Sequence, residues 1–70
     1  MKYYKVKSAE KVTSPQGNFL HKRTETYLAK DSVAVYEDLS HRFGERLIFI
    51  DAVEIDEKKV KPNTNVLIVI

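Results

Sequence analysis

The sequence predicts a small α+β domain with the order β-β-α-β-β, in which one helix packs on an antiparallel or mixed sheet. Three observations support this prediction. Residues 2–29 are strand-like with turn residues in the middle, residues 32–43 have apolar side chains at helical spacing, and two later segments are almost continuously apolar. A chain of 70 residues has the length of one small domain, so we expect residues 1–70 to form a single domain.

The first two strands are predicted from Lys2 to Thr13 and from Phe19 to Ala29, as a hairpin. Between them lies Ser14-Pro15-Gln16-Gly17-Asn18, in which Pro fixes φ early in the turn and Gly permits a positive φ later. The returning strand is rich in Thr and Tyr, which favour strands.

The register of this hairpin decides which side chains share a face, because a slip of one residue exchanges the two faces of a strand. We expect Thr13 to pair with Phe19, since this register sets Lys7 opposite Glu25 and groups apolar side chains on the other face. The outward face then consists of Tyr3, Lys5, Lys7, Lys11, His21, Arg23 and Tyr27.

A helix is predicted to follow the hairpin. Asp31 or Ser32 can cap its N-terminus, the periodic pattern runs to about Phe43, and Gly44 is suited to end it. At about 100° per residue, one stripe of the helix is apolar. This stripe contains Val35, Tyr36, Leu39 and Phe43, and the opposite side contains Ala34, Glu37, Asp38 and His41.

The segment Leu47–Ile55 is predicted to be a central strand, because it is apolar on both alternating faces. One face would hold Leu47, Phe49, Val53 and Ile55, and the other Ile48, Ile50 and Ala52. A single helix covers only one face of a sheet. The other face must therefore meet solvent, a second copy of the chain, or another partner.

The last strand is predicted at Asn65–Ile70, after a polar connection over Asp56–Thr64. An exposed apolar strand invites aggregation, so this strand needs a cover. Two interpretations stay open: the strand belongs to the sheet of its own chain, or it completes a homodimer interface. The residues expected to take part in self-association are Ile48, Ile50, Val66, Leu67, Ile68, Val69 and Ile70.

Composition restricts the classes of function. The chain contains no Cys, which excludes disulfides, thiolate metal sites and cysteine nucleophiles. Residues 1–30 contain seven Lys/Arg and two acids, whereas residues 31–57 contain two Arg and eight acids, so the molecule is electrically dipolar. No signal peptide or membrane span is recognisable, and we expect a cytoplasmic protein.

No combination of residues indicates catalysis. The two histidines, His21 and His41, lie on different predicted elements, and the acids in Glu54-Ile55-Asp56-Glu57 read as a strand end entering a polar loop. The two glycines have local structural roles and form no phosphate-binding loop. We therefore expect no enzyme activity, no cofactor, no metal site and no small-molecule substrate.

Two functional hypotheses follow. The first is a binding or assembly module that contacts another protein, or a second copy of itself, through the open sheet face and the C-terminal strand. The alternative is the binding of single-stranded nucleic acid or RNA by cations that contact phosphates and rings that stack on bases. The residues expected to bind nucleic acid or an acidic partner are Tyr3, Lys5, Lys7, Lys11, Arg23 and Tyr27.

The N-terminal hairpin carries a distinctive pattern in the segments Lys5-Val6-Lys7, Glu10-Lys11-Val12-Thr13 and Lys22-Arg23-Thr24-Glu25-Thr26-Tyr27-Leu28, with Gly17 between them. This pattern resembles the opening of a small uncharacterised family of Bacteroidetes and phage-associated proteins, which has a lysine-valine strand, an asparagine-glycine turn and a T-E-x-Y-L strand. The resemblance covers less than half of the chain. It implies a bacterial or phage-encoded protein and no known activity.

A second resemblance rests on the β-β-α-β order and on the start Lys2-Tyr3-Tyr4-Lys5-Val6. Both are similar to the repeat unit of the ribosomal protein LX, which implies binding of ribosomal RNA. This chain has Gly44-Glu45-Arg46-Leu47 where that family carries a basic arginine-lysine run before its third strand.

Overall fold

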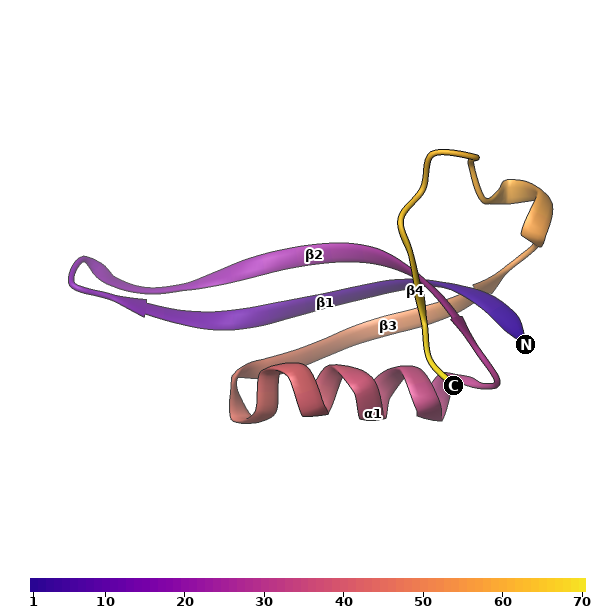
Figure 1. The fold of residues 1–70 in the computed structure, drawn as a ribbon. Helices are drawn as coiled ribbons and strands as arrows, with labels where there is room; N and C mark the ends of the chain where they lie inside the picture. Colours follow the sequence, from indigo (N-terminus) through magenta and orange to yellow (C-terminus); the bar gives the residue numbers. More distant parts are fainter.

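The computed structural model describes all residues from Met1 to Ile70 and shows four strands and one α-helix (Figure 1). The elements are β1 (Lys2–Ser14), β2 (Gly17–Ala29), α1 (Ser32–Phe43), β3 (Leu47–Ile55) and β4 (Val66–Ile68). Two short 3-10 turns, η1 (Gly44–Arg46) and η2 (Glu57–Lys59), precede and follow β3. The predicted α+β fold and its element order are confirmed.

The four strands form one mixed sheet in the order β3-β1-β2-β4. β1 is antiparallel to both of its neighbours, whereas β2 and β4 are parallel. The prediction that Leu47–Ile55 is the central strand is wrong, because β3 lies at one edge of the sheet. β3 is apolar on both faces because one face packs against α1, while apolar residues on the other face stay exposed.

The hairpin turn is tighter than the sequence indicated. Only Pro15 and Gln16 lie between the strands, and Gly17 has the expected positive φ, at 126°. The Ser14 hydroxyl contacts the turn twice: it accepts a bond from the Gln16 N–H at 3.3 Å and donates to the Gly17 carbonyl at 3.0 Å. The shorter turn shifts the register, so Thr13 pairs with Asn18 and the expected pairing with Phe19 is wrong.

The helix has the predicted limits. The carboxylate of Asp31 accepts a hydrogen bond from the backbone N–H of Ala34 at 2.9 Å, which caps the N-terminus. Gly44 ends the helix with a φ of 57° and donates its N–H to the carbonyl of Ser40. Val35 and Leu39 on the apolar stripe are fully buried, while Tyr36 is half exposed and stacks edge-on against Phe49.

A β-bulge interrupts β3 at Ile50. Lys7 pairs with Asp51 and Ser8 pairs with Phe49, so Ile50 has no partner on β1. The bulge changes which residues share a face: Leu47, Phe49 and Ala52 pack toward the core, and Ile48, Val53 and Ile55 lie on the other side. The two predicted faces of this segment are therefore wrong.

β4 pairs with β2 inside the same chain, over Val66–Ile68 only. The backbone N–H of Val69 continues this pairing by donating to the carbonyl of Leu28 at 3.0 Å. The connection from β3 to β4 rises on the side of the sheet away from α1 (Figure 1). Of the two interpretations left open by the sequence, the strand belongs to its own sheet, where it forms the second edge.

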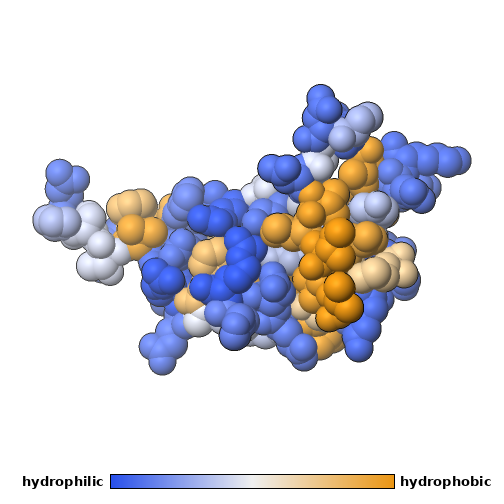
Figure 2. Space-filling model, in the orientation of Figure 1, coloured by the Kyte–Doolittle hydropathy of each residue, from blue (hydrophilic) through white to orange (hydrophobic).

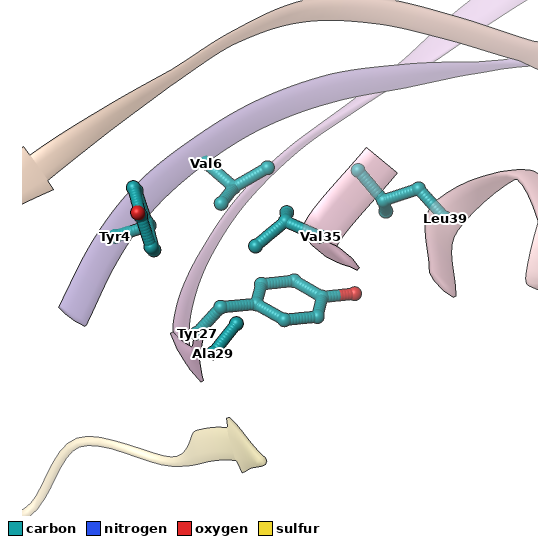
Figure 3. Close-up of a cluster of buried hydrophobic side chains, with 6 residues drawn as sticks. All are labelled: Tyr4, Val6, Tyr27, Ala29, Val35 and Leu39. Atoms are coloured by element: carbon teal, nitrogen blue, oxygen red, sulfur yellow. The ribbon is translucent and has the colours of Figure 1, made fainter. Parts of the chain in front are cut away.

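The core lies between α1 and the adjacent ends of β1 and β2 (Figure 3). Six buried side chains point toward one another there, namely Tyr4, Val6, Tyr27, Ala29, Val35 and Leu39. The far part of the hairpin extends well beyond this core, because β3 reaches only to Glu10 on β1. The protein is consequently elongated, with extents of 43 × 22 × 16 Å.

Candidate functional site

The six residues expected to bind nucleic acid or an acidic partner do not share one surface. In the observed register, Tyr4 pairs with Tyr27 and Ser8 pairs with Arg23, so Tyr27 and Arg23 lie on the helix-covered face. Tyr3, Lys5, Lys7 and Lys11 lie on the opposite face, which we call the open face. His21, expected on the same outward surface, also lies on the helix-covered side of β2.

Tyr27 has a structural position in place of the expected surface position. Its ring is fully buried, and its hydroxyl donates to Oδ2 of Asp38 on α1 at 2.8 Å. The same hydroxyl accepts a hydrogen bond from Nη1 of Arg42 at 2.7 Å, and Arg42 also pairs with both carboxylate oxygens of Glu25, at 3.4 and 3.2 Å. These hydrogen bonds link α1 to β2.

The network perturbs two ionisable groups. Burial, together with the hydrogen bond to Asp38, raises the pKa of the Tyr27 hydroxyl well above its ordinary value. Burial lowers the pKa of the Arg42 guanidinium, but the hydrogen bonds to Glu25 and Tyr27 outweigh it and the net shift is upward. Tyr27 is therefore neutral and Arg42 charged throughout the physiological range.

Arg23 is held against the helix-covered side by an aromatic ring. Its guanidinium carbon lies 5.0 Å from the centre of the Phe43 ring, and the guanidinium carbon of Arg42 lies 4.9 Å from the same centre. Nε of Arg23 is buried and has no hydrogen-bond partner. Arg23 thus packs on the helix-covered face and does not belong to the basic surface that the lysines form on the open face.

The open face carries a row of apolar side chains that crosses all four strands. Ile55 on β3 is opposite Tyr3 on β1, Tyr3 is opposite Leu28 on β2, and Leu28 is opposite Ile68 on β4. The next row contains Val53, Lys5, Thr26 and Val66. We call the six residues Tyr3, Leu28, Val53, Ile55, Val66 and Ile68 the apolar patch.

Exposure is uneven within the apolar patch. Val53 and Ile68 are 54 % and 63 % exposed, whereas the other four residues are partly shielded. Figure 2 shows hydrophobic residues gathered over the β4 edge, where the patch ends. A contiguous exposed apolar area of this kind is typical of an interaction site.

Lysines border the apolar patch on the open face. The residues with their side chains on this side of β1 and β2 include Lys5, Lys7, Lys11 and Lys22, and the acid among their strand partners is Asp51, opposite Lys7. Sequence reasoning missed Lys22, because the expected register placed even-numbered residues of the second strand on the other face. An alternation of Leu20, Lys22 and Thr24 was visible but could not by itself assign the face.

The residues expected to take part in self-association are separated in the fold. Ile48 and Ile50 lie on β3, at one edge of the sheet, while Val66, Leu67, Ile68, Val69 and Ile70 lie on or after β4, at the other edge. Val69 packs against the core, and Ile50, Ile68 and Ile70 are exposed. Within a single chain the two groups are separated by β1 and β2.

The arrangement offers no group of residues suited to bind a metal ion: no three His, Asp or Glu side chains lie close enough together. His21 and His41 are both exposed, on β2 and α1. No helix in the fold has the length and apolar character needed to cross a membrane.

Comparison of the chain with known protein families, with characterised proteins and with solved structures finds no match. The two family resemblances therefore stay predictions, and the geometry of the sheet carries the functional argument.

Proposed function

We propose that the protein is a non-enzymatic binding module that recognises a partner protein through the open face of its sheet. The observation that carries this proposal is the apolar row Ile55, Tyr3, Leu28 and Ile68, which crosses all four strands on the face that α1 does not cover. Burial of such a row against a partner contributes roughly 25 cal/mol for each Å² removed from water.

The surroundings of the patch favour a particular kind of partner. Lys5 and Lys7 follow Tyr3 along β1, and Lys22 lies on the neighbouring strand, so the patch has a basic border. Stacking the open faces of two copies would bring these like charges together, which opposes self-association through this face. The surface fits a protein with an apolar centre and acidic side chains around it.

Affinity capture from cell extract tests this proposal. The immobilised bait would be the wild-type chain, the variant Ile68→Lys, and the control Phe19→Lys, in which an exposed apolar residue is replaced at the hairpin tip, outside the patch. We expect one or more proteins to be retained by the wild type and the control, to be lost with Ile68→Lys, and to elute as salt rises. Equal retention by all three baits would refute the open face as the binding surface.

A second candidate function is binding of single-stranded nucleic acid. The observation in its favour is that Lys5, Lys7, Lys11 and Lys22 share a face with one acid, Asp51, among their strand partners. Tyr3 is the one aromatic ring left on that face, which weakens the case for base stacking.

Titration of a single-stranded oligonucleotide at several salt concentrations distinguishes the two candidates. If Lys5 and Lys7 contact phosphates, replacing both with Ala should weaken binding and reduce the slope of log K against log salt by about 1.4, at about 0.7 for each contact. An unchanged affinity and slope would rule out this candidate.

A further inference from the structure

β3 is an edge strand whose features that oppose strand pairing are Asp51, Glu54 and the bulge at Ile50. All of its residues, from Leu47 to Ile55, lack a partner on the outer side, and the segment contains no Lys, Arg or Pro. Natural edge strands are commonly blunted by such residues. The free part of the opposite edge, on β2 beyond the end of β4, does carry Lys22 and Arg23. β4, which forms the rest of that edge, also lacks Lys, Arg and Pro but has 3 residues, whereas β3 offers 9 residues for pairing with another strand.

Apolar side chains flank this edge on both sides of the sheet. On the helix side, a groove between α1 and β3 is lined by Ser32, Val33, Tyr36, Phe49 and Ala52. Val33 and Tyr36 are 61 % and 49 % exposed there. Val53 on the open face and Ile50 at the bulge are about half exposed beside the same edge. A strand added to β3 would find apolar contacts above and below the sheet.

The backbone groups available for pairing can be deduced from the hydrogen bond between the N–H of Val69 and the carbonyl of Leu28. Leu28 points its backbone groups toward β4, so its partner Tyr3 points toward β3, because the direction alternates along antiparallel strands. The residues of β3 whose backbone groups point toward β1 are consequently the partners of odd-numbered residues of β1. The residues that present free backbone groups to solvent are Leu47, Phe49, Ala52 and Glu54.

We propose that β3 pairs antiparallel with β3 of a second copy of this chain, about a two-fold axis between Ile50 and Asp51. In this register Leu47 lies opposite Glu54 of the partner copy, and Phe49 lies opposite Ala52. In each of these pairs, both residues have backbone groups free to bond across the dimer, and both side chains lie on the same face of the sheet. Ile48 and Val53 of the two copies form the intervening pair on the open face.

The bulge at Ile50 is what makes this register self-complementary. It shifts the alternation by one residue, so the core-facing residues Phe49 and Ala52 can meet across a two-fold axis, a large side chain against a small one. Without the bulge, this pairing would place core-facing residues of one copy opposite residues of the other copy whose side chains lie on the open face. The irregularity of the strand thus has a geometric use.

The charges near the ends of β3 are arranged for an antiparallel partner. Arg46, whose largely exposed side chain pairs with Glu10 of its own chain at 3.0 Å, comes to lie between Glu54 and Asp56 of the other copy, where Glu54 already pairs with Lys2 at 3.7 Å. Glu45 beside Arg46 offsets part of this attraction, so the apolar pairs carry most of the interaction. The two copies of Asp51 meet near the axis, each opposite Lys7 of its own β1.

The surface available is sufficient for a weak, specific dimer. An aromatic side chain offers about 200 Å², so Tyr36 at 49 % exposure contributes about 100 Å². With Val33, Ile50, Val53 and the edge backbone, each copy buries about 500 Å², or about 1,000 Å² in total, where specific interfaces begin. We therefore expect association that depends on protein concentration.

The dimer has one continuous eight-stranded sheet, twice the four strands of one chain. The two helices lie on one side of it and the two open faces on the other, which displays both copies of the apolar patch in the same direction. The inference does not depend on the function proposed above, since Ala52 on the β3 edge and Ile68 in the apolar patch can be altered separately.

Proline substitution provides a matched test by sedimentation velocity from about 1 μM to about 500 μM. Ala52→Pro removes an outward N–H that the single chain does not use, and Thr24→Pro does the same on the free edge of β2. We expect the wild type and Thr24→Pro to dimerise with rising concentration. Ala52→Pro should weaken the dimer by about 100-fold, because the two-fold axis removes two hydrogen bonds at once.

The absence of native cysteines allows an independent test of the register. The double variant Ile48→Cys with Val53→Cys should form disulfide-linked dimers on mild oxidation, because pairs without hydrogen bonds bring their Cβ atoms closest. Thr24→Cys is the control and should stay uncrosslinked. The proposal is overturned by a wild type that is monomeric at all concentrations, by a dimer that survives in Ala52→Pro, or by crosslinking through Thr24→Cys alone.

Discussion

The substitution Tyr27→Phe removes the hydroxyl that joins β2 to α1. This hydroxyl makes two bonds, one to the carboxylate of Asp38 and one from the guanidinium of Arg42, and hydrogen bonds to charged groups contribute about 1.5–3 kcal/mol each. The side chains of Asp38 and Arg42 are about one third exposed, so water can replace part of the loss. We expect a decrease in the free energy of unfolding of about 1.5–2 kcal/mol.

Chemical denaturation with urea, followed by circular dichroism, measures this change. For a domain of this size the loss corresponds to a melting temperature lower by about 6–16 °C. Tyr36→Phe is the matched control, because Tyr36 is half exposed and its hydroxyl makes no hydrogen bond in the fold. We expect that control to differ from the wild type by less than about 0.5 kcal/mol. A loss below about 0.5 kcal/mol for Tyr27→Phe would refute the network as the link between helix and sheet.

Further predictions concern pH and the ends and apolar side of the helix, each measured by urea unfolding. Because the folded state raises the pKa of Tyr27, the contribution of this residue to the free energy of unfolding is complete below the unfolded pKa near 10. Above that pH the contribution is lost by up to about 1.4 kcal/mol per pH unit. Tyr27→Phe should lack this decrease of stability with pH. Asp31→Ala removes the N-terminal cap and should cost about 1 kcal/mol, with Asp31→Asn nearly neutral. Gly44→Ala should cost about 1–3 kcal/mol through its positive φ, although no atom blocks a Cβ there. Leu39→Ala should cost about 2–5 kcal/mol, and a loss below about 1 kcal/mol would contradict its place in the core.

Element order and most element limits were predictable from local signals. Asp31 and Gly44 mark the helix ends through side-chain capping and positive φ, which depend on neighbouring residues only. Leu47–Ile55 has the same limits in the structure as in the prediction. The alternation and turn residues likewise located both strands of the hairpin.

The register of the hairpin was not predictable, because two local arguments competed. Pairing Lys7 with Glu25 favoured one register, but a two-residue turn at Pro15 and Gln16 imposes the other. In the observed register Glu25 and Tyr27 face α1 and meet Arg42, a contact 17 residues away from Glu25 in the sequence. Such long-range polar contacts leave no periodic signal.

The candidate site was only partly predictable for the same reason. Tyr3, Lys5, Lys7 and Lys11 were placed together correctly because they alternate on one strand. The row through Leu28, Ile55 and Ile68 depends on strand order, on the parallel pairing of β4 and on the bulge at Ile50. None of these three features follows from the pattern of a single segment.

The central claim is that the open face carries the row Ile55, Tyr3, Leu28 and Ile68, since the proposed function depends on it. Nuclear Overhauser spectroscopy of the isotopically labelled protein tests this directly. We expect contacts from the ring of Tyr3 to the methyl groups of Leu28 and Ile55, and from Tyr4 to the ring of Tyr27. Contacts between Tyr4 and Leu28 in their place would establish the other register and would contradict the account.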